Sequence, residues 1–571
     1  MRKQTKLVAV LSTAALLAIG ASMTSFAAQG WAEEDGTWVY YDKNGDKVTD
    51  SWKKSGDSWY WLDENGEMAV DMLVEDDDNY YYVNENGTMV TNQWVAVENE
   101  DAGEDGEPDH YWYYFQANGK AYRRSDTSST ISAKTINGKK YAFDTDGKML
   151  YGWVNDSFER VTDEDTEWQE GLYYFGGEDD GAMRVNTWEL ISITSDEEAD
   201  EIQPGDEFWD EDQDRWFFFQ SSGKKKYADG DKVFTDKKIN GKKYGFDKYG
   251  RMVASWYSED LQKASGSITT VASDSQGNPD YSHSFMYFSN PEDGARYSKG
   301  WFKVVPGYYL HESKYEDDAD YWYYANGDGN IIANRVKKIK GKTYAFDEYG
   351  RMISGLALLK YTDSSDSDGT EIVKYADDDK QYSYDTEDAF NETAMGDLAE
   401  DLANGTFRFM YFGGADDGSM KTGRQNIDID GETFAFKFAT KSNIKGAGLT
   451  GVDDDKFYVG GKLVKADKDD KYQIVKFTKY ADADGVKENA WVVVDDDVKI
   501  SELLGKTDSD RESIKDATFW DLSKAKGMDV YRVVNTSGKI VEGNGKSVKN
   551  GDDYKIKVNK DGVIQSITLE D

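Results

Sequence analysis

Residues able to carry nucleophilic, acid–base or metal chemistry are few and scattered in this sequence of 571 residues. Its three histidines, His110, His283 and His311, lie in different segments, and no spacing resembles a metal triad. The chain has no cysteine and no Gly-x-Ser-x-Gly nucleophile elbow with a partnered histidine. Carboxylates occur everywhere, so no pair of them is diagnostic of a glycosidase. The sequence therefore predicts a protein that is not an enzyme and uses no cofactor.

Three acidic segments have the oxygen-rich composition that calcium prefers. They are "NEDAGEDGEPDH" at Asn99–His110, "DEDQDRW" at Asp210–Trp216 and "YEDDADYW" at Tyr315–Trp322. None has the ligand spacing of a helix–loop–helix calcium site. Bound calcium and a solvated acidic loop both remain open interpretations.

Aromatic residues have the clearest spacing. A period of 21 residues separates Trp31, Trp52, Leu73 and Trp94, and the same period separates the turn glycines Gly45, Gly66 and Gly87. A fixed period of this size indicates a tandem array. Aromatic clusters flanked by Asp-Gly and Asn-Gly turns are typical of β-hairpins. One hairpin is marginal in water, so we expect neighbouring hairpins to share rings at their junctions.

The pattern continues with insertions, in three types of unit that recur in the same order. The lysine-rich type, for example "INGKKYAFDTDGKMLYGW", has its turn glycine at Gly147, Gly250 and Gly350. We therefore predict an all-β solenoid of tandem β-hairpins, with about three hairpins per superhelical turn. The insertions should lengthen hairpin tips, and the longest, Leu358–Thr406, is expected to hold a short helix near Asp388–Leu402.

Three parts are predicted along the chain. Residues 1–27 read as a signal peptide, with basic Arg2, Lys3 and Lys6, an apolar run and a small-residue cleavage site. A membrane anchor is the alternative, but the apolar run is shorter than the ~20 residues of a span. Residues 28–466 form the repeat array. Residues 467–571 form a β-rich C-terminal domain, with strands in "YQIVKFTK", "AWVVVDD", "VYRVVN", "YKIKVN" and "VIQSITL" and one helix in "SDRESIKDATFWDL".

The net charge of the chain limits the classes of partner that it can bind. The formal net charge is −42, and loss of the three basic residues of the signal peptide makes it −45. Such a polyanion repels nucleic acid and anionic lipid head groups, so no nucleic-acid partner is expected. No membrane span is expected either, because no segment after the first residues has the apolar length of a span. Solubility alone also explains this charge.

The unit "GWAEEDGTWVYYDKNGDKVTDSW" resembles the cell-wall-binding repeat family, the choline-binding repeats of Gram-positive surface proteins. Matching residues are Gly30-Trp31, Trp38, Gly45 and Val48-Thr49 in the first unit, then Trp52, Trp59 to Leu62, Gly66 and Met68 in the second. The lysine-rich units are similar to repeats of clostridial glucosylating toxins and to glucan-binding repeats. The resemblance covers about residues 30 to 466 and weakens after Gly423.

The resemblance implies a ligand held between successive hairpins, in a cage of two Trp from one unit and an aromatic from the next. A quaternary ammonium donates no hydrogen bonds, so ring faces must hold it, at ~0.5–2 kcal/mol per ring. Carried over by position, the implied ligand-binding residues are Trp31, Trp38, Trp52, Trp59, Tyr60, Trp61, Tyr80, Tyr81, Trp94 and Trp112. The alternative is that these rings are simply core. In the lysine-rich units Lys140, Lys243 and Thr343 replace a ring, so no complete cage is expected there.

We therefore expect a secreted protein of the cell wall or cell surface that binds wall polymer, such as teichoic acid, choline or glycan, through many weak sites. Two alternatives remain. One is an adhesin or host-interaction protein that uses the long insertions. The other is a wall hydrolase, or an accessory to one, with an unrecognised C-terminal domain.

Overall fold

The computed structural model describes residues 29–103, 107–125, 133–163, 165–193, 213–232, 234–258, 284–308, 310–361, 370–375, 384–441, 443–479, 491–503 and 530–570. The predicted signal peptide, residues 1–27, lies outside them. The chain divides into two compact units, the first of residues 1–194 with 217–226 and the second of 195–216 with 227–571. The described residues contain no helix with the length and apolarity needed to cross a membrane.

The described residues of the first unit form short strands and one short helix. Its strands are β1 Gly30–Glu34, β2 Thr37–Tyr41, β3 Ser51–Ser55, β4 Ser58–Leu62, β5 Met72–Asp76, β6 Asn79–Val83, β7 Gln93–Glu98, β8 His110–Phe115, β9 Lys134–Ile136, β10 Lys139–Tyr141, β11 Trp153–Val154, β12 Tyr173–Tyr174 and β13 Thr187–Ile193, and its helix is α1 Glu167–Glu170. Strand β14, Gln213–Phe219, crosses the boundary between the units.

The second unit holds the remaining elements. Its strands are β15 Phe234–Ile239, β16 Lys242–Asp247, β17 Ser255–Ser258, β18 Phe285–Phe288, β19 Gly300–Val304, β20 Tyr321–Ala325, β21 Arg335–Ile339, β22 Lys342–Phe346, β23 Leu356–Tyr361, β24 Thr370–Tyr375, β25 Phe407–Tyr411, β26 Gly423–Ile429, β27 Glu432–Phe438, β28 Gly451–Asp453, β29 Lys456–Val459, β30 Lys462–Leu463, β31 Tyr472–Lys479, β32 Trp491–Asp495, β33 Val530–Asn535, β34 Lys546–Lys549, β35 Tyr554–Val558 and β36 Ile564–Leu569. Its helices are α3 Glu312–Glu316, α4 Glu387–Asn391, the π-helix η4 Glu392–Asp397, α5 Ala399–Asn404 and α6 Ile500–Leu503.

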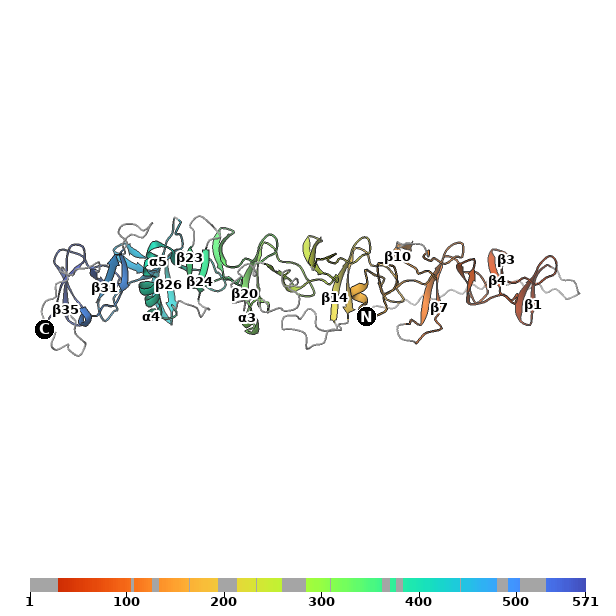
Figure 1. The fold of residues 1–571 in the computed structure, drawn as a ribbon, viewed down its shortest axis with the longest axis horizontal. Helices are drawn as coiled ribbons and strands as arrows, with labels where there is room; N and C mark the ends of the chain where they lie inside the picture. Colours follow the sequence, from red (N-terminus) through yellow and green to blue (C-terminus); the bar gives the residue numbers. More distant parts are fainter. Residues whose placement is uncertain are drawn as a thin grey trace. The chain divides into compact units, whose positions relative to one another are not determined.

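Tandem antiparallel hairpins dominate both units, which confirms the predicted all-β hairpin fold (Figure 1). In the first hairpin, Trp31 lies opposite Tyr40 and Glu33 lies opposite Trp38. The tight turn at Asp35-Gly36 has positive φ at both residues, 51° and 88°, as the predicted Asp-Gly turns require. The prediction of three hairpins per superhelical turn concerns the overall shape and stays a prediction.

Backbone hydrogen bonds tie each hairpin to the one before it. Met68 N donates to Trp38 O at 2.7 Å, and Met89 N donates to Trp59 O at 2.8 Å. The next turn glycine lies against the residue that makes this bond, Gly87 against Met68 and Gly119 against Met89. Gly87, for example, has a φ of 71°, which favours glycine, and a Cβ there would lie 2.8 Å from Met68 Cε. The period of 21 residues is therefore a packing constraint between neighbouring hairpins.

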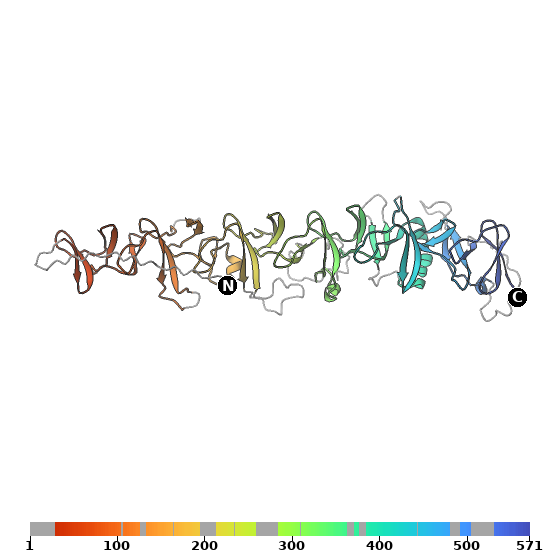
Figure 2. The same cartoon turned by 180° about the vertical axis from the view of Figure 1, so that it is seen from behind.

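The long insertion after β23 does hold helices, as predicted. Helices α4 and α5 pack beside β26 in both views (Figures 1 and 2). Phe390 and Leu402 of these helices belong to one buried cluster with Phe409 and Phe436. This is a larger core than those at the hairpin junctions, because the insertion brings its own apolar residues.

The five strands predicted beyond residue 467 are present as β31, β32, β33, β35 and β36, while the predicted helix at 509–522 lies outside the described residues. The repeat turn also recurs here. Asn535 N donates to Lys539 O, Ile540 N donates to Asp455 O, and Val534 bridges Ile540. A turn of the repeat type therefore also occurs after residue 467, and the domain boundary at that residue stays a prediction.

Candidate functional site

One rule holds at the junctions of these Trp residues, each on the first strand of its hairpin: Trp31, Trp52, Trp94, Trp153, Trp256 and Trp301. The Trp packs against the ring opposite it in its own hairpin and against the ring six residues before the turn glycine of the next hairpin. Trp31 lies 5.4 Å from Tyr40 and 5.4 Å from Tyr60, measured between ring centroids. Trp52 lies 5.3 Å from Trp61 and 5.0 Å from Tyr81. Of the predicted set, these contacts bring Trp31 to Tyr60 at the first junction, and Trp52 to Trp61 and Tyr81 at the second.

The other predicted rings at these two junctions lie apart from them. Trp38 shares a hairpin face with Trp31, and Trp59 shares one with Trp52, but neither is in ring contact within the described part of the chain. Trp59 is 40% exposed, which leaves its face open. Tyr80 lies opposite Glu75 and packs in the cluster of Tyr82 and Tyr113, away from Trp52. Whether any of these positions binds a ligand stays a prediction.

The third predicted pair, Trp94 and Trp112, also comes together with a ring of the next hairpin. Trp94 of β7 and Trp112 of β8 lie 6.5 Å apart at 85°. Tyr141 of the lysine-rich hairpin lies 4.8 Å from Trp94. Trp94 thus lies beside a second Trp of its own hairpin and a Tyr of the next, and ring faces of this kind suit a compact cation without hydrogen-bond donors. We call these three rings the first cage.

The second unit repeats this cage almost unchanged. Trp301 of β19 and Trp322 of β20 lie 6.4 Å apart at 85°, and Tyr344 of the next lysine-rich hairpin lies 4.7 Å from Trp301. A phenylalanine stacks under each first Trp, Phe143 at 5.8 Å and Phe346 at 5.6 Å. We call Trp301, Trp322 and Tyr344 the second cage.

An aspartate from a later loop reaches the second Trp of each cage. Trp112 Nε1 donates to Asp179 Oδ1 at 3.0 Å, and Trp322 Nε1 donates to Asp416 Oδ1 at 3.2 Å. The indole hydrogen bond, followed by Lys303, lowers the pKa of Asp416. Each cage therefore has a carboxylate at its edge, and a carboxylate favours a cationic ligand.

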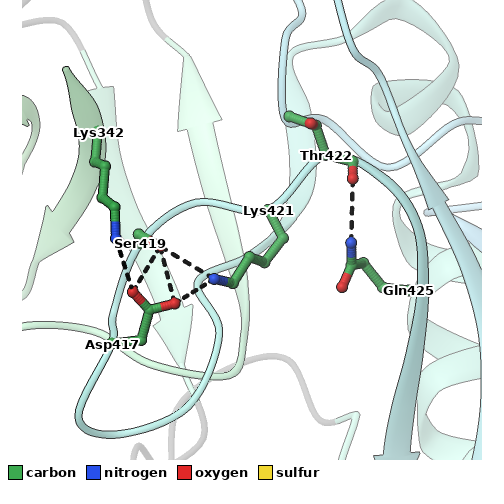
Figure 3. A network of polar contacts seen from close by, with 6 residues as sticks. All are labelled: Lys342, Asp417, Ser419, Lys421, Thr422 and Gln425. Carbon is green, nitrogen blue, oxygen red and sulfur yellow. Dashed lines mark hydrogen bonds and ion pairs between the residues drawn. The ribbon is translucent and has the colours of Figure 1, made fainter.

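A polar network holds the loop that presents Asp416 (Figure 3). The neighbouring Asp417 accepts hydrogen bonds from Ser419 Oγ at 2.8 and 2.9 Å and from Lys421, and Lys342 Nζ lies 3.4 Å from its Oδ1. The bonds from Lys421 and Ser419 outweigh partial burial and lower the pKa of Asp417. Lys342 comes from the same hairpin as Tyr344, so the network fixes the loop relative to the cage.

The first unit has the same anchor with different side chains. Asp180 accepts from Arg184 Nη1 at 2.7 Å and from Lys139 Nζ at 3.2 Å. Burial opposes ionisation of Asp180, but the bonds from Arg184 and Lys139 outweigh it and lower its pKa. The lysine two residues before the cage tyrosine thus anchors the loop in both units, which gives the lysine-rich hairpins a role.

Sequence reasoning missed several cage residues: Tyr141, Asp179, Trp301, Trp322, Tyr344 and Asp416. It compared Lys140 with a ring of the first units and did not expect a cage at a lysine-rich hairpin. The ring six residues before each turn glycine was the available signal, since Tyr60, Tyr81, Tyr141 and Tyr344 all hold that place. The lysine-rich hairpin supplies this ring to the junction before it.

The calcium hypothesis gains no support. Among the described residues, which omit parts of the segments at 99–110 and 210–216, no three Asp, Glu or His side chains are grouped so that they could hold a metal ion. Binding of calcium stays a prediction.

Comparison with known proteins gives a family match at the N-terminal repeats. Residues 28–72 and 48–94 match the model of the choline-binding repeat family. No curated protein matches the chain significantly.

Solved structures of Streptococcus pneumoniae proteins are similar over longer stretches. The modular autolysin LytC in complex with a synthetic peptidoglycan ligand is 16% identical over 59% of this chain and 55% of its own, about half its length, with a TM-score of 0.28. Choline-binding protein F, solved with a peptidoglycan analogue, is 16% identical over 77% of this chain and 100% of its own, with a TM-score of 0.26. The choline-binding domain of CbpL is 16% identical over 53% and 97%, with a TM-score of 0.22.

The matched residues include the first two ring junctions, whose contact rule recurs in both cages. This chain therefore carries choline-binding-type cell-wall-binding repeats, matched directly over residues 28–94.

Proposed function

We propose that this protein binds a choline-bearing polymer of the cell wall, with the first and second cages as its main sites. The observation that carries the proposal is the recurrence of one ring geometry in the two units, with Trp–Trp separations of 6.5 and 6.4 Å, both at 85°. Core packing alone requires no carboxylate at the exposed edge of each ring set, and both cages have one.

The chemistry of the cages favours a trimethylammonium group over other wall components. Such a group cannot donate a hydrogen bond, so ring faces and apolar contact must hold it. Asp179 and Asp416 add negative potential without having to bond to the ligand. Two sites on one chain gain avidity when the polymer carries many choline groups, because the second binding event becomes intramolecular.

Export and retention at the cell surface complete the proposal. The sequence of residues 1–27 supports export, and the family match supports attachment to the wall. Under this proposal residues 28–466 form the binding array, and residues 467–571 are a separate β-rich domain. The protein acts by attachment and not by catalysis.

Retention on purified choline-bearing walls, followed by elution with free choline, tests the proposal on the full chain. Trp112→Ala and Trp322→Ala each remove one cage wall, and each should weaken retention by ~tenfold or more through lost avidity. The double variant should lose the fraction that choline elutes. Leu190→Ala, at a site 47% exposed, is the matched surface control and should bind normally.

A melting curve for each variant separates lost binding from lost folding. Full retention of the folded double variant, or retention that free choline does not reverse, would contradict the assignment of the cages.

A further inference from the structure

A cavity of about 670 Å³ opens at the Trp256 hairpin of the second unit. Its lining includes Trp256, Tyr287, Tyr308 and Tyr315, three carboxylates and Lys303. This volume is within the range of small-molecule sites and exceeds what a single ammonium group needs. The cavity lies outside both cages, since none of the three rings of the second cage lines it.

Aromatic rings form one wall of the cavity. Trp256 lies 5.1 Å from Tyr287, and its Nε1 donates to Val305 O at 2.7 Å, which ties the tip of the next hairpin to the indole. That tip, which includes helix α3, contributes Tyr308 and Tyr315, whose rings meet edge-on at 5.7 Å. The insertion thus extends an ordinary junction into a pocket with broad ring faces.

Acidic side chains line the cavity on the side of the insertion. They are Glu316, Asp318 and Asp320, all exposed. None of the three makes a side-chain hydrogen bond or ion pair within the described residues, whereas the neighbouring Asp317 is paired with Lys314 at 3.0 Å. Lys303, the basic residue of the lining, has its Nζ 3.4 Å from Asp416 Oδ1. The carboxylates are therefore available to a cationic ligand.

The corresponding hairpin of the first unit shows an ammonium on the equivalent indole. Lys225 is 1% exposed, and its Nζ lies 5.2 Å from the centroid of the Trp153 ring. The same Nζ donates to Trp168 O at 2.7 Å and to Gln169 O at 3.1 Å. The Trp153 junction is thus closed around an amine supplied by the chain itself.

Ile331 holds the position of Lys225 at the Trp256 junction. Lys225 N donates to Leu172 O, and Ile331 N makes the same bond to Phe285 O. At this position an apolar side chain therefore stands in place of the lysine, while the indole remains and the insertion of the next hairpin adds carboxylates. The comparison shows that an indole of this type of hairpin can face an ammonium group, and at Trp256 the cavity is the side from which an external amine can approach.

We propose that the Trp256 cavity binds a protonated amino sugar of a glycan. The flat C–H face of the sugar packs on Trp256 and Tyr287, and the ammonium group faces Glu316, Asp318 and Asp320. A sugar ring uses the aromatic walls and the volume, and its hydroxyl groups donate to the remaining carboxylate oxygens. This site uses none of the cage rings and does not require choline, and Lys303 borders both this cavity and the second cage.

Calorimetric titration of the full chain with the disaccharide of glucosamine, and with its N-acetylated form, tests the inference. The charged disaccharide should bind and the neutral one should bind at least ~tenfold more weakly, since acetylation removes the ammonium. Glu316→Gln and Asp318→Asn should each weaken binding by about two- to fivefold, the size expected for exposed charge pairs. Tyr308→Ala should weaken both sugars, because it removes part of the ring wall.

Two controls separate this site from the cages. Trp322→Ala should leave binding of the amino sugar unchanged, and Glu316→Gln should leave choline-eluted retention unchanged. Equal binding of the two disaccharides, or no binding of the charged one, would overturn the inference. So would equal competition by lysine amide, because the cavity would then recognise a flexible amine and not a sugar ring.

Discussion

The two cages have nearly the same rings but different charges around them. In the first cage the residue opposite Trp112 is Ala96, and in the second the residue opposite Trp322 is Lys303. Lys303 Nζ lies 6.0 Å from the centroid of the Trp322 ring and 3.4 Å from Asp416 Oδ1. In the first cage Asp179 instead meets His110 Nε2 at 3.1 Å.

This difference separates the residues that pack between hairpins from the residues that set the charge around a ligand. Trp94, Trp301 and the phenylalanines beneath them pack between hairpins, so their geometry is fixed by the fold. The positions opposite Trp112 and Trp322 are exposed and can change without disturbing that packing. Lys303 places an ammonium beside the ring face that a choline would use and neutralises part of the field of Asp416. We therefore expect the first cage to bind cations more tightly than the second.

The largest expected effect is a loss of stability, caused by removing the Trp that packs between hairpins and also belongs to a cage. Trp94→Ala and Trp301→Ala each delete a side chain that touches its own hairpin and the next one. Each should lower the free energy of unfolding by about 3 kcal/mol, measured by urea denaturation with circular dichroism. Trp112→Ala and Trp322→Ala, the matched controls, should cost under about 1 kcal/mol because these rings lie at the cage edge.

Equal destabilisation by all four substitutions would remove the distinction between packing rings and ligand rings, and with it the comparison between the cages.

A smaller effect, on the affinity of each cage for choline, is expected from changing the charge opposite its second Trp. Lys303→Ala should raise the affinity of the second cage for choline by about two- to fivefold, since it removes a competing ammonium from the ring face. Ala96→Lys should lower the affinity of the first cage by a similar factor. Calorimetric titration of each variant, in a background where Trp112→Ala or Trp322→Ala silences the other cage, reads the two sites separately. Affinities that stay unchanged in both variants would show that these positions do not set cation preference.

Sequence reasoning went furthest where one hairpin or two neighbours decide the structure. The Asp-Gly and Asn-Gly turns, the ring clusters and the first-strand Trp residues repeat at a fixed period, so the hairpins could be predicted directly. The helices after Glu387 were also predictable, because an apolar pattern with helical spacing appears in an insertion otherwise rich in polar residues. These features depend on local propensity and on contacts between adjacent units.

The rest of the site depends on contacts that local reasoning does not reach. Trp112 and Asp179 are 67 residues apart, and Trp322 and Asp416 are 94 apart. Such acidic loops are abundant in the chain, so nothing in the sequence marks one aspartate as the partner of an indole. Tyr141 was missed for another reason: its neighbours Lys140 and Ala142 break the ring cluster, although Tyr141 itself keeps its place relative to Gly147.

The smallest expected effect concerns the carboxylate of the second cage and its response to pH. The hydrogen bond from Trp322, with a further contribution from Lys303, lowers the pKa of Asp416. A depressed pKa means that the carboxylate persists as pH falls through the usual range of aspartate and is protonated only below it. Choline affinity of the second cage, measured with the first cage silenced by Trp112→Ala, should therefore stay flat between about pH 7 and pH 5.

Asp416→Asn should lower that affinity by about twofold at neutral pH and remove any further decline in acid, because the amide has no charge to lose. Asp417→Asn is the matched comparison. It leaves the carboxylate of Asp416 in place but weakens the bonds to Ser419 and Lys421 that hold the loop. Both variants are expected to lose the same affinity for choline at neutral pH. Asp417→Asn should still lose more affinity in acid, whereas Asp416→Asn should not. That result would show that the loop affects choline binding by holding Asp416 in position. If Asp416→Asn leaves the affinity for choline unchanged, the carboxylate only supports the Trp322 ring. The two cages would then differ only by Lys303.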